Sequence, residues 1–73
     1  MIEDNIYFID TPVDIQDEVF YKVLENLKNI NTNDNIYLKF VSSLNIPNKY
    51  YFNVYIGKSF DSNAIPEFLI FIQ

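Results

Sequence analysis

Alternating apolar positions mark the extended parts of this chain. The segments IYLKFVSS at 36–43 and KYYFNVYIG at 49–57 alternate in the way that is typical of strands with one buried face. NIYFI at 5–9 is a short β-branched and aromatic run, and FLIFIQ at 68–73 is apolar almost throughout. We therefore predict four strands over these segments.

A different spacing, close to the helical period, runs from Val13 to about Asn29. The apolar residues that recur at this spacing are Val19, Phe20, Val23, Leu24, Leu27 and Ile30, and they share a face with Val13 and Gln16. The opposite face carries Asp14, Glu18, Tyr21 and Glu25. The pattern predicts one amphipathic helix, with Thr11 as its N-cap and Pro12 at its first position.

Polar turn-forming residues separate these elements. NTNDN at 31–35 predicts a loop after the helix, in which Asn can take the left-handed conformation that often ends a helix. Ile46-Pro47-Asn48-Lys49 predicts a type I turn within a hairpin, because proline suits the second position of such turns. A polar loop over 58–64 contains Asp61-Ser62-Asn63 as its turn.

The predicted elements follow the order β-α-β-β-β in a single domain that spans residues 1–73. We expect an α+β fold with a mostly antiparallel four-stranded sheet and one helix packed on one face. The last three strands form a meander, and the first strand joins through the helix, beside either the second or the fourth strand; we favour the fourth. The core then includes Ile36, Leu38, Phe40, Phe52, Val54, Ile56, Phe68 and Ile70.

Composition narrows the class of protein. A chain of 73 residues with 49% hydrophobic and 18% aromatic residues predicts a small globular domain held by packing, since it has no cysteine for disulfides. Residues with AT-rich codons are abundant, which suggests a bacterial, phage or mobile-element source. The start MIEDN is acidic and unlike a secretory signal, so we expect a cytoplasmic protein.

The sequence lacks the residues that most kinds of catalytic site require. Histidine, cysteine and arginine are absent, and the single glycine excludes glycine-rich phosphate loops. We therefore expect a protein that is not an enzyme and that binds no cofactor. The net charge of −5 argues against binding to nucleic-acid phosphates or to anionic membranes.

Carboxylates are the remaining candidates for chemistry. Asp14, Asp17 and Glu18 lie within one turn of the predicted helix and could hold Mg²⁺ or Ca²⁺. Acids are also expected in a first turn because they interact favourably with the helix dipole, and we favour this interpretation. The asparagines at 31–35 lack the carboxylates, glycine and final glutamate of a calcium loop, so we predict no metal site.

The second face of the predicted sheet is unusually aromatic for a solvent-facing surface. The apolar and tyrosine residues that alternation places there are Tyr37, Val41, Tyr51, Tyr55, Leu69 and Phe71. One helix covers only one face, and large apolar patches are rare on monomers. We interpret this face as a surface for a partner or a second copy; the alternative is that cross-strand pairs simply stabilise the sheet.

The outer face of the helix is acidic. Asp14, Glu18 and Glu25 form a row that Lys22 and Lys28 interrupt. The row is either an ordinary solvated helix surface or a negative patch that binds a basic partner. The most specific version of the second alternative is that the row mimics nucleic-acid phosphates.

These features together predict a small acidic protein-binding factor, of inhibitor or immunity type, that blocks a larger macromolecule. Its partner-binding residues are Tyr37, Val41, Tyr51, Tyr55, Phe71, Asp14, Glu18 and Glu25. The alternative is a homodimer or larger homo-oligomer that pairs through the sheet face or an edge strand.

Overall fold

The computed structural model describes residues 2–44 and 46–73, with the side chains of residues 2 and 3 excepted. A short 3₁₀ turn, Ile2–Asn5, precedes β1 (Ile6–Ile9), and the helix α1 spans Val13–Leu27. The remaining strands are β2 (Asn35–Phe40), β3 (Tyr50–Gly57) and β4 (Phe68–Ile72). The predicted α+β class and the order β-α-β-β-β are confirmed.

The sheet has the order β1-β2-β3-β4, so β1 lies beside β2 and not beside β4. Our preference for the fourth strand was wrong. β1 and β2 are parallel, whereas β2 pairs with β3 and β3 with β4 in antiparallel fashion. Contacts along the β1–β2 border explain the placement, because Tyr7 stacks on Tyr37 and Lys39 pairs with Asp10 at 3.0 Å.

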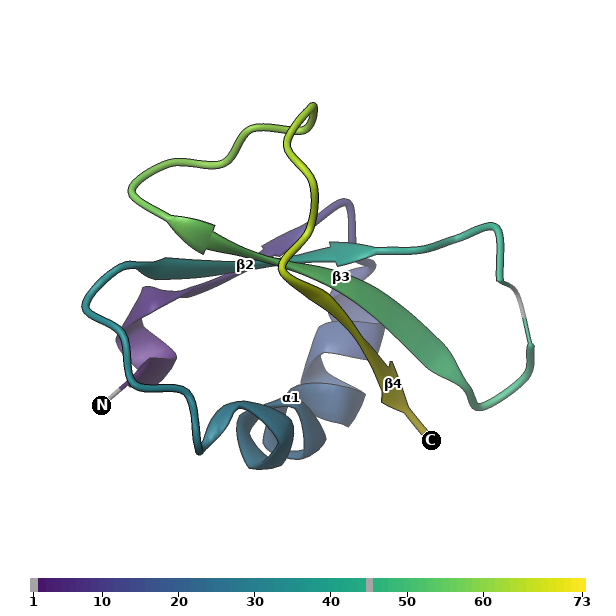
Figure 1. The fold of residues 1–73 in the computed structure, drawn as a ribbon. Coiled ribbons are helices and arrows are strands. Elements are labelled where there is room, and N and C mark those ends of the chain that lie inside the picture. Colours follow the sequence, from purple (N-terminus) through teal and green to yellow (C-terminus); the bar gives the residue numbers. More distant parts are fainter. Residues whose placement is uncertain (1, 45) are drawn as a thin grey trace.

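The hydrophobic core lies between α1 and one face of the sheet (Figure 1). The helix contributes Val19, Val23 and Leu27, all fully buried. The sheet residues of this core are Ile36, Leu38, Phe52, Val54, Ile70 and Ile72. Of the predicted core residues, Phe68 is the exception, because it lies at the start of an edge strand and is 37% exposed.

The start of the helix differs from the prediction. Pro12 occupies the N-cap position without a side-chain cap, and the Thr11 hydroxyl instead donates to the Ile9 carbonyl at 3.0 Å. The Gln16 side chain donates to the Thr11 carbonyl at 2.8 Å. Val13 is exposed, whereas Ile15 in the same helical turn packs against the core.

Two turns also differ in conformation. The helix ends at Leu27 with Lys28 in right-handed geometry, so no asparagine in the following loop supplies a left-handed cap. Asn48 has a φ of 62°, and a positive φ at the third turn position is the signature of a type II turn, not the predicted type I. The turn at Asp61 is confirmed, since the Ala64 N–H donates to the Asp61 carbonyl at 3.0 Å.

Candidate binding surface

The loop between β3 and β4 covers part of the sheet face opposite the helix (Figure 1). Phe60, in this loop, lies 5.7 Å from the ring centre of Tyr37 and 5.1 Å from that of Tyr55. As a result, Tyr37 and Tyr55 are each only 9% exposed. The interpretation of this face as a surface left uncovered by the chain therefore fails at Tyr37 and Tyr55.

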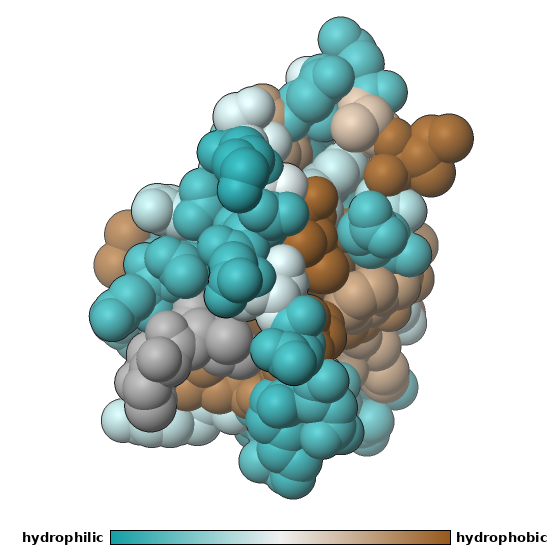
Figure 2. Space-filling view, turned by 60° about the vertical axis from the view of Figure 1, so that its left-hand side comes forward, coloured by the Kyte–Doolittle hydropathy of each residue, from teal (hydrophilic) through white to brown (hydrophobic). Residues whose placement is uncertain are grey.

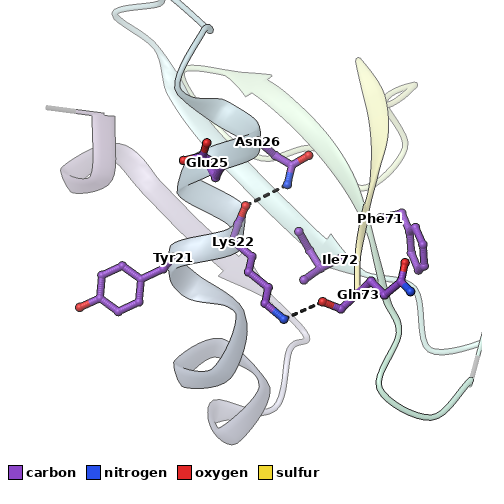
Figure 3. A pocket seen from close by; sticks show the side chains of 7 residues that line it. All are labelled: Tyr21, Lys22, Glu25, Asn26, Phe71, Ile72 and Gln73. Atoms are coloured by element: carbon purple, nitrogen blue, oxygen red, sulfur yellow. Dashed lines mark hydrogen bonds between the residues drawn. The ribbon is translucent and has the colours of Figure 1, made fainter.

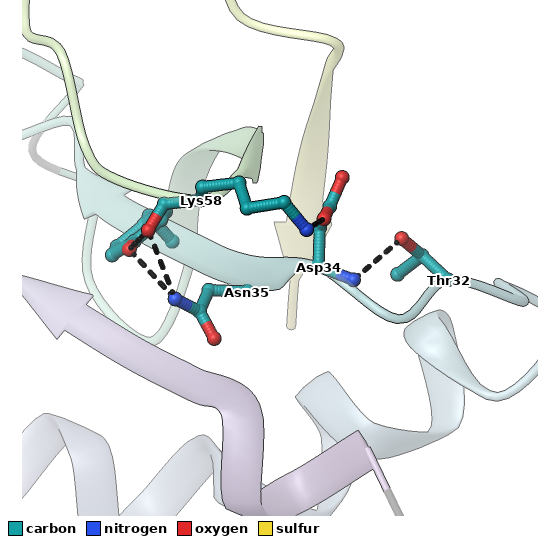
Figure 4. Close-up of polar contacts among 5 residues, drawn as sticks. Thr32, Asp34, Asn35 and Lys58 are labelled. Carbon is teal, nitrogen blue, oxygen red and sulfur yellow. Dashed lines mark hydrogen bonds and ion pairs between the residues drawn. The ribbon is translucent and has the colours of Figure 1, made fainter.

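Polar contacts hold this loop to the start of β2 (Figure 4). The Lys58 ammonium pairs with Asp34 at 2.9 Å, and this hydrogen bond is the main reason why the pKa of Lys58 is raised. The Asn35 amide donates to the Tyr37 hydroxyl at 3.1 Å and to the Lys58 carbonyl at 3.3 Å. These contacts therefore hold the start of the loop against β2. Phe60, a little further along the same loop, contacts Tyr37 and Tyr55.

The part of the second face that remains accessible lies over β3 and β4. Tyr51 stacks on Phe71 with ring centres 4.7 Å apart, and this pair is half-exposed. Leu69 is 50% exposed and Phe71 is 40% exposed. Val41 borders Tyr51, to whose carbonyl its N–H donates at 2.9 Å. We call Tyr51, Leu69 and Phe71 the apolar patch.

A separate exposed aromatic lies at the other edge of the same face. Tyr7 of β1 is 46% exposed and stacks on Tyr37 at 5.4 Å. We did not predict its contribution, because NIYFI is too short for its faces to be assigned by alternation. Phe60 was also missed, although an isolated aromatic residue in a polar loop is a signal that could have indicated a covering role.

The three predicted acidic residues are all exposed on α1. Glu18 accepts a hydrogen bond from the Tyr50 hydroxyl at 3.2 Å, and Glu25 pairs with Lys28 at 2.7 Å. Desolvation is the largest cause of the raised pKa of Tyr50, followed by the hydrogen bond to Glu18 and the charges of Glu18 and Asp14. Glu18 and Asp14 thus lie on the side of the helix that faces the end of the β3–β4 pair.

An open groove runs between the second half of α1 and the end of β4 (Figure 3). Its volume is about 460 Å³, and its lining residues are Tyr21, Lys22, Glu25, Asn26, Phe71, Ile72 and Gln73. The Lys22 ammonium donates to the Gln73 carbonyl at 2.6 Å across it. Because Glu25 and Phe71 line the same groove, the acidic helix face and the apolar patch meet at the edge formed by β4.

The surface chemistry of one side of the molecule is mixed (Figure 2). Hydrophilic residues cover most of this view, and hydrophobic residues emerge as a strip between them and as one projection. Ile65, in the loop before β4, is 90% exposed, more than any other large hydrophobic side chain that the structure describes.

The described residues offer no cluster of three or more carboxylates that could hold a metal ion. Over the same residues, no helix is long and apolar enough to cross a membrane. The structure separates the predicted partner-binding residues. Tyr37 and Tyr55 are buried against Phe60, whereas Glu25 and Phe71 line the groove beside β4. Tyr51 stacks on Phe71, Val41 borders Tyr51, and Asp14 and Glu18 are exposed on α1.

Comparison of the chain with family models, with curated proteins and with solved structures finds no match, so a functional proposal rests on the residues of this surface alone.

Proposed function

We propose that this protein is a non-enzymatic binding factor, of inhibitor or immunity type, that acts in the cytoplasm on a larger protein. Its binding site is the surface around β4, where the apolar patch meets the acidic residues of α1. The protein does not have to modify its partner chemically, because binding to the partner's surface is enough to block it.

The exposed apolar patch is the observation that carries this proposal. Tyr51, Leu69 and Phe71 lie on neighbouring strands, and Leu69 pairs with Asn53 next to the Tyr51–Phe71 pair. The core already contains Phe52, Ile70 and Ile72 from the same strands. The side chains of the patch therefore add little to the core. Aromatic residues at the centre of a patch supply most of the binding energy in protein interfaces.

Acidic residues give this patch a charged border on the helix side. Glu18 contacts Tyr50, which pairs with Ile72 of β4, and Glu25 lines the groove beside Phe71. Charges at the rim of an interface chiefly raise the rate of association with a partner of opposite charge. The proposed partner therefore has basic residues next to an apolar contact area.

Affinity capture with paired variants tests the apolar patch. Tyr51→Ser combined with Phe71→Ser should abolish capture of the partner that the wild-type protein retains from its native host. Ile65→Ser is the matched control, because it also removes an exposed hydrophobic side chain but lies in the loop outside the patch. Equal capture by the folded double variant and the control would remove the patch from the proposal.

Charge reversal tests the acidic border separately. Glu18→Lys with Glu25→Lys should slow association with the captured partner by about tenfold at low salt, because steering depends on the local potential. The control, Asp4→Lys with Asp61→Lys, changes the net charge equally at exposed positions away from the groove. The difference between the two variants should vanish at high salt, where such interactions are screened. An equal effect of both variants would contradict a localised acidic site.

A further inference from the structure

The loop between β3 and β4 rests on the sheet mainly through one side chain. Over residues 58–67 only Phe60 and Pro66 are partly shielded from solvent, and the other residues are exposed. Of the hydrogen bonds among the described residues, none joins 59–66 to another part of the chain, and those that these residues make stay within the loop. The two aromatic contacts of Phe60 therefore hold the middle of the loop in place.

The start of the loop is held by contacts that are open to water (Figure 4). The ammonium of Lys58, whose side chain is 88% exposed, pairs with Asp34 at 2.9 Å. The Lys58 carbonyl accepts long hydrogen bonds from the Asn35 amide at 3.3 Å and from the Tyr37 hydroxyl at 3.4 Å. Exposed ion pairs are weak, and a segment with few buried contacts opens more easily than the core of the same domain.

The tyrosines under the loop keep their positions through contacts that do not involve it. Tyr37 and Tyr55 lie directly opposite each other in the pairing of β2 with β3. Tyr7 stacks on Tyr37, and the Asn35 amide donates to the Tyr37 hydroxyl at 3.1 Å. Release of Phe60 therefore uncovers a surface that is already formed.

We propose that residues 58–66 form a lid, closed by Phe60 and latched by the Lys58–Asp34 pair, which opens without unfolding of the sheet. Opening exposes Tyr37 and Tyr55. Tyr55 lies on the same face of β3 as Tyr51, because alternate residues of a strand share a face. The open lid therefore extends the apolar patch along β3 and towards β2. This consequence for binding rests on the proposed function, whereas the opening itself is a property of the isolated chain.

Acetylation of the Tyr55 hydroxyl, located by mass spectrometry, detects the open lid in the purified protein. The rate should rise only slightly in urea below the unfolding transition, because opening of one loop exposes little surface and sensitivity to urea scales with the surface exposed. A Tyr55 rate that rises as steeply as the unfolded fraction would overturn the proposal, since the reaction would then require global unfolding.

A variant without the latch distinguishes opening from direct reaction through a closed lid. Lys58→Met keeps the aliphatic stem and removes the ammonium, so it should raise the Tyr55 rate about twofold to fivefold, the change that loss of an exposed ion pair can produce. Lys28→Met is the matched control, because it makes the same change of charge and removes the exposed pair with Glu25 on α1. This control should leave the rate unchanged. An unchanged rate in Lys58→Met would contradict the lid.

Salt tests the latch without a further substitution. Sodium chloride at about 1 M screens exposed pairs, so it should raise the Tyr55 rate of the wild-type protein and have little effect on Lys58→Met, which has no latch to screen. Equal responses of the two proteins would rule out the latch. None of these measurements includes a partner. Failure of the lid would therefore leave the proposed binding site beside β4 intact, and failure of the capture experiment would leave the lid intact.

Discussion

Replacement of Phe52 by alanine should lower the free energy of unfolding by about 3–5 kcal/mol, the usual range for a buried phenylalanine. Phe52 is fully buried and contacts Phe8 and Phe40, with ring centres 6.0 Å and 5.8 Å away. A domain of 73 residues has a total stability of about 4–11 kcal/mol at the usual values per residue. The substitution therefore removes a large part of the stability, and a substantial fraction of the variant should be unfolded at 37 °C.

Phe71→Ala is the matched control for this prediction. Phe71 lies in the neighbouring strand on the opposite face, is 40% exposed and stacks on Tyr51. Its loss should cost roughly 1 kcal/mol, the value of one aromatic pair. Urea denaturation followed by circular dichroism measures both variants. Equal losses for the two would mean that the two faces of the sheet contribute equally to folding, contrary to the burial that distinguishes them.

Alternation along the strands predicted the core correctly because side chains of a strand point to opposite faces in turn. Ile36 and Leu38 of β2 and Phe52 and Val54 of β3 are all fully buried, as expected. The helix was equally predictable, since the spacing of Val19, Val23 and Leu27 repeats the helical period. These are properties of local geometry and can be inferred from one segment at a time.

The position of β1 could not be inferred in that way. Alternation tells which face a side chain occupies, but not which strand lies beside it. The choice depends on pairs such as Tyr7–Tyr37 and Lys39–Asp10, which join segments about 30 residues apart in sequence. The start of α1 could not be predicted from the local pattern either, because the Thr11 hydroxyl donates to the Ile9 carbonyl and does not cap the helix.

The sequence predicted the acidic residues and the aromatic residues of the candidate site. Only the structure shows that these two groups lie close together. The sequence places the acids of α1 and the tyrosines on opposite sides of a sheet. The short distance around the edge strand brings them together, since Glu25 and Phe71 line one groove. A sheet with β1 beside β4 has no such edge at β4. Because β1 lies beside β2, the outer edge of β4 and the groove next to it remain open.

Replacement of Phe60 by alanine should expose the tyrosines that the loop covers. Phe60 makes two aromatic contacts, with Tyr37 and Tyr55, and each pair of this kind contributes about 0.5–1.5 kcal/mol beyond its buried area. We expect a loss of about 2 kcal/mol in the free energy of unfolding, with the domain still folded at 25 °C. Tyr55 should gain more exposure than Tyr37, because Tyr7 continues to stack on Tyr37.

Acetylation of tyrosine hydroxyls, located by mass spectrometry, measures this exposure residue by residue. In the wild-type protein Tyr21 should react fast and Tyr55 slowly, and Phe60→Ala should bring the rate of Tyr55 close to that of Tyr21. Ile65→Ala is the control, since it shortens a fully projecting side chain in the same loop and should leave Tyr55 protected. A fast-reacting Tyr55 in the wild-type protein would contradict the covering role of Phe60. It would also return Tyr55 to the surface on which a partner can bind, and so enlarge the apolar patch towards β2.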